Sequence, residues 1–392
     1  MAIISSLLDT DLYKLTMLNA VLDYCKRVNI DIPTVQYRFK CRNKKNVLQY
    51  KDKIHKEIEA FKKLIFTAEE YEYLESLKLF SPEFLDYISN INLQDVSVAM
   101  YNVGGELQID IEGSWATAIL FEVPVLSIVN EIYFKNMTID KGDMTNRLKT
   151  FLKEMIDGKM VFTDFGTRRR FSKAWQGKCI REAMKVGIIE GTSNVMYAQK
   201  YDIKPVGTMA HEWLQAFQAL SKNLENFQID ALNNWMLTYR GKLDTALTDI
   251  VGIDAFLDDW DKFFANNYSG LRHDSGSPFD FVDKVEEWCY KKLGICAYQH
   301  FPRLLFSDSL TPEVCAKIKQ YCQYRSFHYA FGIGTNFTNN TSAEALQIVI
   351  KLTKVNGQNV IKLSDSKGKR MNDDTNMIHR LTETFGLTSE GK

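Results

Sequence analysis

From about residue 155 onward the chain repeats one unit: a short apolar run, a small polar or glycine-containing loop, and an amphipathic helical pattern. Short strands that alternate with helices are typical of βαβ units with a parallel sheet. So many units in one domain predict a closed or nearly closed barrel, in which the loops after the strands share one face. We expect a functional site on that face. The loops are 162–170, 190–194, 206–213, 246–250, 270–278, 304–310 and 331–340.

The two ends of the chain follow a different pattern. A helical pattern over 10–24, a strand over 34–40 and three further helical stretches are followed by two strands that meet at Gly104-Gly105, a hairpin signal. Ser81-Pro82 has the form of a helix N-cap followed by a first-turn proline. After residue 345 a second hairpin is predicted around "VNGQN", so the tail is expected to pair with the N-terminal domain.

These patterns predict an α/β protein with two domains. An α+β domain is expected over 1–135 with 346–392, and an α/β barrel domain over 136–345.

The composition favours a globular protein that binds a small ligand. With 392 residues, 45% of them hydrophobic, the chain can bury a large core. The 49 basic and 49 acidic side chains cancel without a long single-sign block, which argues against nucleic acid or an anionic membrane as partner. Seven scattered cysteines without a CxxC pair argue against a disulfide framework and indicate a reducing compartment.

No targeting segment or membrane span is expected. The N-terminus has no basic region before its apolar residues, and the most apolar run, 115–129, contains Glu122 and Pro124. We therefore expect a cytoplasmic protein with no membrane partner.

The loop "FGIGTNFTNN" has the composition of a phosphate site. Gly332 and Gly334 would let backbone N–H groups approach an anion, and Thr335 offers a hydroxyl. A plain left-handed turn between strand and helix would use the same glycines. No GxxxxGK[ST] motif occurs, so no P-loop accounts for nucleotide binding.

The loop "GLRHDSGSP" places three polar residues in succession at a strand end. Side chains alternate across a strand, so Arg272 and Asp274 should lie on one side and His273 on the other. A guanidinium suits a carboxylate or phosphate, and a carboxylate suits hydroxyls or a developing cation. A structural ion pair is the alternative.

The loop "FTDFGTRRRFS" combines Phe165 with Arg168, Arg169 and Arg170, ahead of the expected helix N-cap Ser172. A solvated basic face is the usual meaning of such a run, but one arginine could reach an anion site. Asp249 and Asp308 follow other strands, where either could simply cap the next segment.

In the stretch "GTMAHEW", His211 lies where a strand-like run over 204–209 meets a helical pattern over 210–220. A histidine at a helix start is often satisfied by a neighbouring carboxylate and has no chemical role. Among several anion-suited loops, an imidazole can instead be a nucleophile or an acid/base. The sequence does not identify the group that orients His211, and Glu212, its neighbour, points about 100° away around a helix.

Taken in order, these loops resemble the nicotinate phosphoribosyltransferase family. The similarity runs from "SLLDTDLYKLTM" through "FTDFGTRRRFS", "EGTSNVMYAQKYDIKPVGTMAHEW" and "LRHDSG" to "FGIGT" and "VIKLSDSKGK". Each motif is weak alone, and their joint occurrence in order is specific.

The resemblance implies a type II phosphoribosyltransferase: an irregular α/β barrel plus an α/β domain built from both chain ends. The expected state is a head-to-tail homodimer with shared active sites. It implies an enzyme of the ligase class that condenses nicotinate with phosphoribosyl pyrophosphate, giving nicotinate mononucleotide and pyrophosphate for NAD synthesis. ATP is implied as co-substrate, acting through a phosphohistidine at His211, with Mg²⁺ accompanying the diphosphate substrates. No protein ligand of a metal is implied.

The resemblance also implies roles for individual residues. Tyr13 and Phe165 correspond to the two rings that enclose nicotinate, Tyr13 being supplied by the partner subunit. Thr208 and Arg272 correspond to nicotinate-site positions, with Arg272 the partner of the substrate carboxylate. The remaining correspondences are to active-site or phosphoribosyl phosphate positions, and they are Arg168, Asp274, Gly334 and Thr335.

Ser193 bears on the choice of substrate. Related enzymes that use nicotinamide have an aspartate in the loop corresponding to "EGTSN", where Ser193 lies here. An aspartate would repel a carboxylate substrate and serine would tolerate it, so nicotinate is favoured.

Three alternatives remain open from the sequence. A sister transferase that uses nicotinamide or quinolinate is the nearest. A barrel aldolase or isomerase would need a Schiff-base lysine or a paired acid and base at strand ends, and the loops after the strands offer no such lysine. A degenerate homologue that only senses nucleotides is the third.

Overall fold

The structure is a computed structural model that describes residues 2–294, 302–363 and 374–387. The chain forms two compact units. Unit 1 comprises Met1–Gly207, Ser309–Pro312 and Gly332–Lys351, and unit 2 comprises Thr208–Asp308, Glu313–Phe331 and Leu352–Lys392. This division does not test the domain limits expected from the sequence, which stay a prediction.

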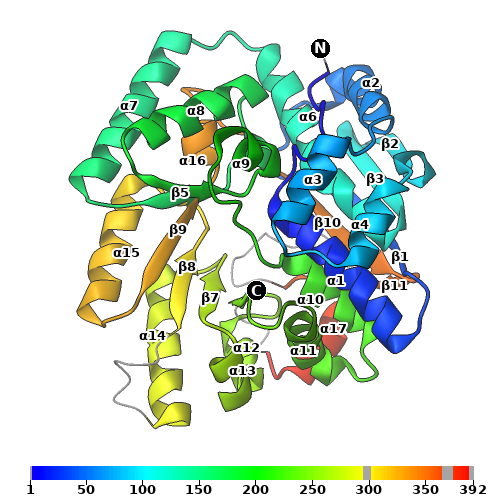
Figure 1. The fold of residues 1–392 in the computed structure, drawn as a ribbon, viewed down its shortest axis with the longest axis vertical. Coiled ribbons are helices and arrows are strands. Elements are labelled where there is room, and N and C mark those ends of the chain that lie inside the picture. Colours follow the sequence, from blue (N-terminus) through cyan, green and yellow to red (C-terminus); the bar gives the residue numbers. More distant parts are fainter. Residues whose placement is uncertain (1, 295–301, 364–373, 388–392) are drawn as a thin grey trace. The chain divides into compact units, whose positions relative to one another are not determined.

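An antiparallel sheet joins segments from both ends of the chain (Figure 1). Its order is β11-β10-β1-β3-β2. The bounds are β1 Thr34–Cys41, β2 Ser97–Val103, β3 Glu106–Ser114, β10 Ile348–Val355 and β11 Gln358–Asn359.

Both predicted hairpins are confirmed. Strands β2 and β3 meet at Val103↔Glu106, and the intervening Gly104 and Gly105 have φ of 59° and 85°, which a type I′ turn requires. Strands β10 and β11 pair at Val355↔Gln358, and β10 lies beside β1, as expected of a returning tail.

The helices of unit 1 cover this sheet and the short parallel strands of the same unit. The expected caps are present, since the Ser81 and Ser172 side chains accept from the backbone N–H groups of Phe84 and Trp175. The helices are α1 Leu12–Val28, α2 Lys51–Phe61, α3 Ala68–Ser76, α4 Pro82–Ser89, α5 Trp115–Ala118, α6 Glu122–Lys135, α7 Lys141–Asp157, α8 Lys173–Lys185, α9 Val195–Tyr201 and α16 Thr335–Thr338.

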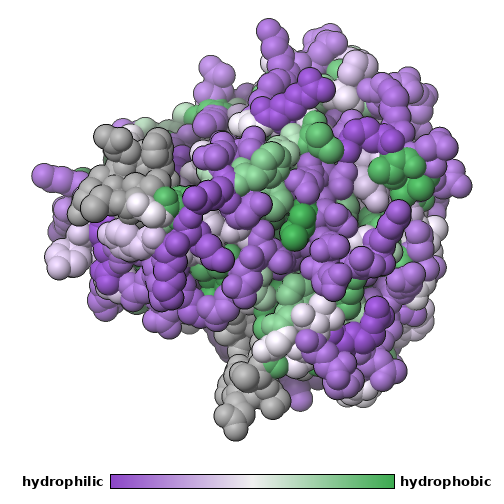
Figure 2. All heavy atoms as spheres, turned by 90° about the horizontal axis from the view of Figure 1, so that it is seen from below, coloured by the Kyte–Doolittle hydropathy of each residue, from purple (hydrophilic) through white to green (hydrophobic). Residues whose placement is uncertain are grey.

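The apolar run that begins at Trp115 forms a helical stretch to Lys135 that is long and apolar enough to cross a membrane. Glu122 and Pro124 therefore do not interrupt it, contrary to expectation. Its most apolar window is 89% buried inside the structure, as in the core helix of a globular protein. Figure 2 shows a face on which hydrophilic side chains predominate and apolar ones form small separate patches.

Parallel strands carry the predicted βα units. In unit 1, β4 (Phe162–Asp164) pairs with β5 (Ile189–Thr192) and with 332–333 of β9 (Tyr329–Ile333). In unit 2, β6 (Thr245–Leu247), β7 (Gly270–His273), β8 (Arg303–Phe306) and 329–331 of β9 pair in succession. Parallel strands with helices, plus the antiparallel sheet, confirm the predicted fold class.

The helices of unit 2 lie before, between and after these strands along the chain, in the green to red part of Figure 1. They are α10 His211–Leu220, α11 Phe227–Tyr239, α12 Ile253–Asp259, α13 Lys262–Asn267, α14 Pro278–Trp288 with a π-helical turn over Cys289–Leu293, α15 Pro312–Tyr324 and α17 Thr375–Thr384. The six cysteines among the described residues are free and buried.

The strand expected over 204–209 was wrong. The structure has only an isolated bridge there, between Pro205 and Thr192. Proline has no N–H to donate to a ladder, which keeps this run from pairing as a strand. A Cβ on Gly207 would lie 2.9 Å from the backbone nitrogen of Tyr13, so this glycine permits a close backbone approach within unit 1.

Candidate active site

The strands of unit 2 end in polar side chains at one edge. Asp249 lies two residues beyond β6, while Asp274 and Ser307 directly follow β7 and β8. Because these strands are parallel, their carboxyl ends share that edge, as the sequence predicted.

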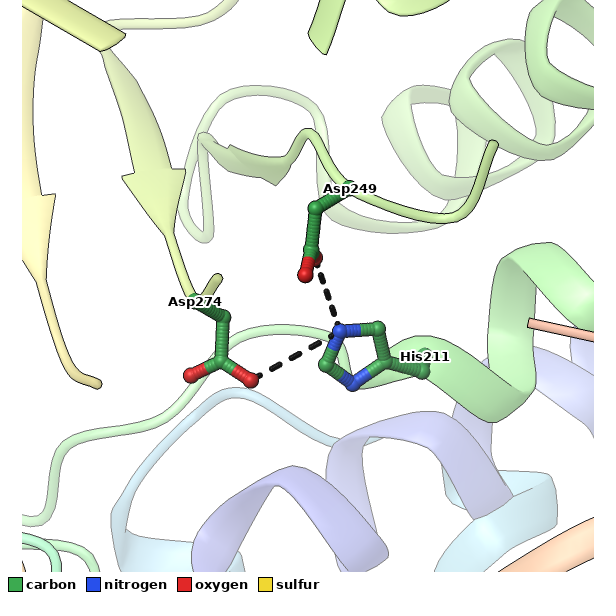
Figure 3. A group of neighbouring side chains, drawn as sticks. All are labelled: His211, Asp249 and Asp274. Atoms are coloured by element: carbon green, nitrogen blue, oxygen red, sulfur yellow. Dashed lines mark hydrogen bonds and ion pairs between the residues drawn. The ribbon is translucent and has the colours of Figure 1, made fainter. Parts of the chain in front are cut away.

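His211 is the first residue of α10 and faces this edge. Its Nε2 lies 2.8 Å from Asp249 Oδ1 and 3.6 Å from Asp274 Oδ2. Figure 3 shows that the other ring nitrogen, Nδ1, points away from both carboxylates. Two aspartates therefore orient His211, whereas the sequence did not identify the orienting group.

Lys362 completes the cluster, and no sequence pattern pointed to it. Its Nζ lies 2.6 Å from His211 Nε2 and 2.6 Å from Asp249 Oδ2, and its side chain is 4% exposed. A lysine inside the apolar run 360–363 was the available signal, because lysine is rarely buried without a partner.

His211 is neutral in this setting. Burial and the Lys362 ammonium lower the pKa of His211 to about 4, against the opposing effect of the two carboxylates. Burial acts to raise the pKa of Asp249, but Lys362 and His211 together hold it well below its usual range. The imidazole therefore has a lone pair available near neutral pH, beside an ionised carboxylate.

Arg272 and Asp274 lie on the same side of β7, as predicted. Arg272 donates from Nη2 to Asp274 Oδ1 at 2.9 Å and from Nε to Ser307 Oγ at 2.8 Å. Although burial acts to raise it, Arg272 and His211 hold the pKa of Asp274 below its usual range. His273 lies on the other side, buried against Phe281 and Phe306, also as predicted.

Thr208 belongs to the same unit but makes a backbone contact. Its hydroxyl donates to the carbonyl of Thr245, the first residue of β6, at 3.1 Å. The structure therefore places Thr208 beside β6, and its role in binding nicotinate stays a prediction.

His211, Asp249 and Asp274 could be suspected of holding a metal, because one ligand atom from each lies within 4.8 Å of the others. The Lys362 ammonium already contacts two of the three, and Ser275 Oγ donates to Asp249 as well. These residues therefore fit a buried ammonium better than a resident metal ion, which would have to displace it.

Unit 1 gathers a second set of strand ends. Phe165, Ser193 and Gly334 each directly follow a strand, after β4, β5 and β9. The three strands are parallel, so these residues share one edge of that sheet. The structure thus brings together four of the predicted positions in unit 1, with Thr335 next to Gly334.

The glycines of "FGIGT" have a packing role that the sequence analysis did not consider. A Cβ on Gly332 would lie 2.2 Å from the ring of Phe165, and one on Gly334 would lie 3.1 Å from the carbonyl of Phe165. Thr335 begins α16, which has only four residues. The phosphate-binding role of Gly334 and Thr335 stays a prediction.

Replacing Gly332 with alanine is expected to lower the free energy of unfolding by about 1–3 kcal/mol, because the added methyl group would overlap the Phe165 ring. Denaturant-induced unfolding of both proteins measures the difference. The double change Gly332→Ala with Phe165→Ala should recover part of the loss. An unchanged unfolding midpoint in the single variant would show that the ring moves aside at no cost.

The three arginines after β4 have different environments. Arg170 is fully buried and forms a bidentate pair with Asp9, at 2.6 and 2.8 Å. Arg169 donates from Nε to the carbonyl of Ile348. Arg168 is 42% exposed, and its Nη1 lies 3.4 Å from Glu122 Oε1.

A buried carboxylate lies beside Ser193. The Ser193 hydroxyl donates to Asp11 Oδ1 at 2.7 Å, and burial raises the pKa of Asp11 although Arg168 and this hydrogen bond lower it. Tyr13, two residues further on in α1, is 8% exposed. Replacement of aspartate by serine in the 190–194 loop therefore does not leave the neighbourhood free of carboxylates.

A second buried acid, Asp164, ends β4. It accepts from Gln176 Nε2, Thr192 Oγ1 and the backbone N–H of Gly166 at 2.8–2.9 Å. Burial nevertheless raises its pKa to about 6, so hydrogen bonds only partly offset the loss of solvent. Asp164 was not among the predicted site residues.

Comparisons with known proteins find relatives over nearly the whole chain. Residues 8–130 match the model of the nicotinate phosphoribosyltransferase (NAPRTase) N-terminal domain, and residues 160–389 match that of the nicotinate phosphoribosyltransferase (NAPRTase) family. A nicotinate phosphoribosyltransferase of Xanthomonas campestris is 41% identical over 98% of this chain and 97% of its own. One of Neisseria gonorrhoeae is 43% identical over 98% of both chains.

Two solved structures are similar over nearly the whole chain. A nicotinate phosphoribosyltransferase from Vibrio cholerae superposes with a TM-score of 0.90 at 32% identity, covering 99% of this chain and 94% of that one. One from Porphyromonas gingivalis gives a TM-score of 0.88 at 30% identity, covering 98% and 100%.

Proposed function

Because the chain belongs to the nicotinate phosphoribosyltransferase family, we propose that it transfers the phosphoribosyl group of phosphoribosyl pyrophosphate to nicotinate, with ATP hydrolysis coupled to the transfer. The products are nicotinate mononucleotide and pyrophosphate, for NAD biosynthesis. The observation that carries the ATP-coupled part is the neutral His211, held by Asp249 and Asp274 beside Lys362.

We propose that His211 is the phosphoryl acceptor. With the proton on Nε2 and donated to Asp249, Nδ1 carries the lone pair and points away from the carboxylates (Figure 3). Nδ1 would form a bond to the γ-phosphorus of ATP while the bond to the bridging oxygen breaks and ADP leaves. Hydrolysis of the phosphohistidine after each turnover resets the enzyme. Asp249 keeps the ring in the reactive tautomer, as carboxylates beside catalytic histidines do.

The transfer of the phosphoribosyl group needs positioning and charge more than covalent chemistry. The ring nitrogen of nicotinate attacks the anomeric carbon as pyrophosphate leaves. We propose that Asp274, kept ionised by Arg272, stabilises the positive charge that develops on the sugar. Arg168, Gly334 and Thr335 are proposed to hold phosphate groups.

For nicotinate itself we propose four contacts. Phe165 stacks on one face of the ring, and Tyr13 from the partner subunit of a homodimer covers the other. Thr208 and Arg272 complete the site, with Arg272 facing the substrate carboxylate. The affinity of a guanidinium for a carboxylate supports the last assignment.

Mg²⁺ would enter with the diphosphate substrates and neutralise their charge. The His211 cluster, in which an ammonium already lies against His211 and Asp249, does not fit a resident metal, so no step is assigned to one here.

The function is tested by incubating the protein with nicotinate and phosphoribosyl pyrophosphate, with and without ATP, and measuring nicotinate mononucleotide. Product that increases with ATP supports the proposal. Nicotinamide and quinolinate, offered in competition, separate it from the sister transferases. Absence of product with nicotinate, but turnover of either competitor, would contradict it.

Replacing Ser193 with aspartate is expected to raise the KM for nicotinate more than about tenfold, because a second carboxylate beside Asp11 would repel the substrate's own. Steady-state kinetics with nicotinate and nicotinamide measure the change. Ser193→Ala is the control, since it removes the hydroxyl without adding charge. A KM that rises equally in both variants would show that the hydroxyl, and not the charge, matters.

A further inference from the structure

The backbone on both sides of Lys362 is fixed by hydrogen bonds within unit 2. Gln218 of α10 donates from Nε2 to the carbonyl of Ile361 and accepts from its N–H, each at 2.8 Å. The N–H of Leu363 donates to the carbonyl of Ile250 at 2.8 Å. The residues before and after Lys362 are therefore held by α10 and by the loop after β6, the same elements that carry His211 and Asp249.

The ammonium that this backbone presents donates to Asp249 and is buried against the His211 ring. It lies 2.6 Å from Asp249 Oδ2 and 2.6 Å from His211 Nε2. Burying an ammonium is costly unless it is paired, and the pairing here is with Asp249. A lysine in solvent could also pair with Asp249, although more weakly, and it would not carry the cost of burial. The burial of Lys362 against the ring therefore points to an effect on His211.

We propose that Lys362 is a positioning residue that keeps a second proton off His211, so that the imidazole stays a neutral nucleophile beside two carboxylates. This inference rests on the proposed phosphorylation of His211, which gives the neutral ring its purpose. It concerns the charge state of the ring and can be tested separately from that function.

The surroundings of His211 would otherwise favour protonation. Asp249 from the loop after β6 and Asp274 from the loop after β7 both face Nε2, and an imidazolium next to them would gain two attractive interactions. Ser275 donates to Asp249, and Arg272 donates to Asp274. These hydrogen bonds only partly reduce the attraction of each carboxylate for a protonated ring. A positive imidazolium 2.6 Å from a positive ammonium is the unfavourable arrangement that Lys362 introduces.

Titration of the His211 ring tests the inference directly. Histidines labelled with ¹³C at Cε1 are followed by NMR from about pH 4 to about pH 8, and the His211→Gln variant assigns the signal among the six histidines. Wild-type His211 is expected to titrate far below the ordinary value of 6.5, since burial and Lys362 lower its pKa to about 4. In Lys362→Met the midpoint should rise by at least about one pH unit.

Two variants serve as controls. Lys362→Arg keeps a positive charge at the site and should leave His211 titrating well below 6.5. Lys354→Met removes an exposed lysine from β10 of the same hairpin and should leave the His211 titration as in the wild type. A wild-type midpoint at or above 6.5, or an unchanged midpoint in a folded Lys362→Met, would overturn the inference. If Lys362→Met does not fold, the wild type and Lys362→Arg still decide it.

Uptake of label from γ-labelled ATP links the charge state to function. Lys362→Met should lose uptake below its new midpoint and recover it as the pH rises, because the ring then loses its proton. A purely structural role for Lys362 would lower uptake by the same factor at every pH. If the wild type takes up no label, the phosphohistidine proposal fails, while the titration still tests the role of Lys362.

Discussion

Replacing His211 with glutamine is expected to abolish retention of label from γ-labelled ATP and to leave weak, ATP-independent synthesis of nicotinate mononucleotide. Glutamine can keep a hydrogen bond to Asp249 but has no basic nitrogen to accept a phosphoryl group. Each tenfold stimulation by ATP corresponds to about 1.4 kcal/mol of coupling, and all of it should disappear. Product formed with and without ATP, measured beside the bound label, gives both results.

The control for this change is an exposed histidine of the same unit. His328→Gln makes the same substitution next to β9 and should keep both the label and the stimulation by ATP. A His211→Gln variant that retained label at the wild-type stoichiometry would place the phosphoryl group elsewhere. Loss of all synthesis, including the ATP-independent part, would show that His211 takes part in the transfer to nicotinate as well.

Replacing Arg170 with methionine is expected to destabilise the protein by about 3–5 kcal/mol, because Asp9 would remain buried without its counter-ion. Arg170 and Asp9 are both fully buried, and the guanidinium also donates to Gln176 Oε1 at 3.2 Å. Asp9 further accepts from Asn194, so loss of the arginine would disturb the turn after β5. The free energy of unfolding from denaturant titration measures the change.

Two further variants separate burial from charge. Arg147→Met removes an exposed arginine that pairs with Asp143 one helical turn away, and it should cost no more than about 0.5 kcal/mol. Adding Asp9→Asn to Arg170→Met removes the unpaired charge and should recover part of the loss. A single Arg170→Met variant that is destabilised by less than about 1 kcal/mol would show that the pair is replaced by other contacts.

Local sequence patterns predicted the helices and strands correctly where the residues of a segment favour a single type of secondary structure. In the strand predicted over 34–40, alternate side chains lie on one face, and Val35, Tyr37 and Phe39 of that face are each 2% exposed. The strand predicted over 204–209 was wrong, because Pro205 has no N–H to donate to a neighbouring strand and Gly207 lies close to the backbone of Tyr13.

The local sequence could predict only those residues of the candidate site that lie at the ends of strands. Arg272 and Asp274 are two residues apart in one strand end, so alternation alone placed them together. The partners of His211 lie 38, 63 and 151 residues away, and such contacts depend on the assembled sheet. Lys362 reaches the site because the chain turns back at the β10–β11 hairpin and because Gln218 and Ile250 bind the backbone of the residues on either side of it. No local sequence pattern predicts these contacts.

The packing role of the glycines was missed for a similar reason. Gly332 and Phe165 are far apart in the chain, and the Phe165 ring leaves no space for a side chain at position 332. A glycine in a loop is compatible with an anion site, a turn or a close contact, and only the three-dimensional neighbours distinguish them.

The route of the chain between the two units has a consequence for folding. The chain passes from one unit to the other after residues 207, 308, 312, 331 and 351, and two of these passages lie inside strands β9 and β10. Unit 1 lacks strand segments of both its sheets until residues 332–351 have been synthesised. Neither unit can therefore complete during synthesis of the first half of the chain, and a fragment that ends at residue 207 should remain an incomplete, aggregation-prone intermediate.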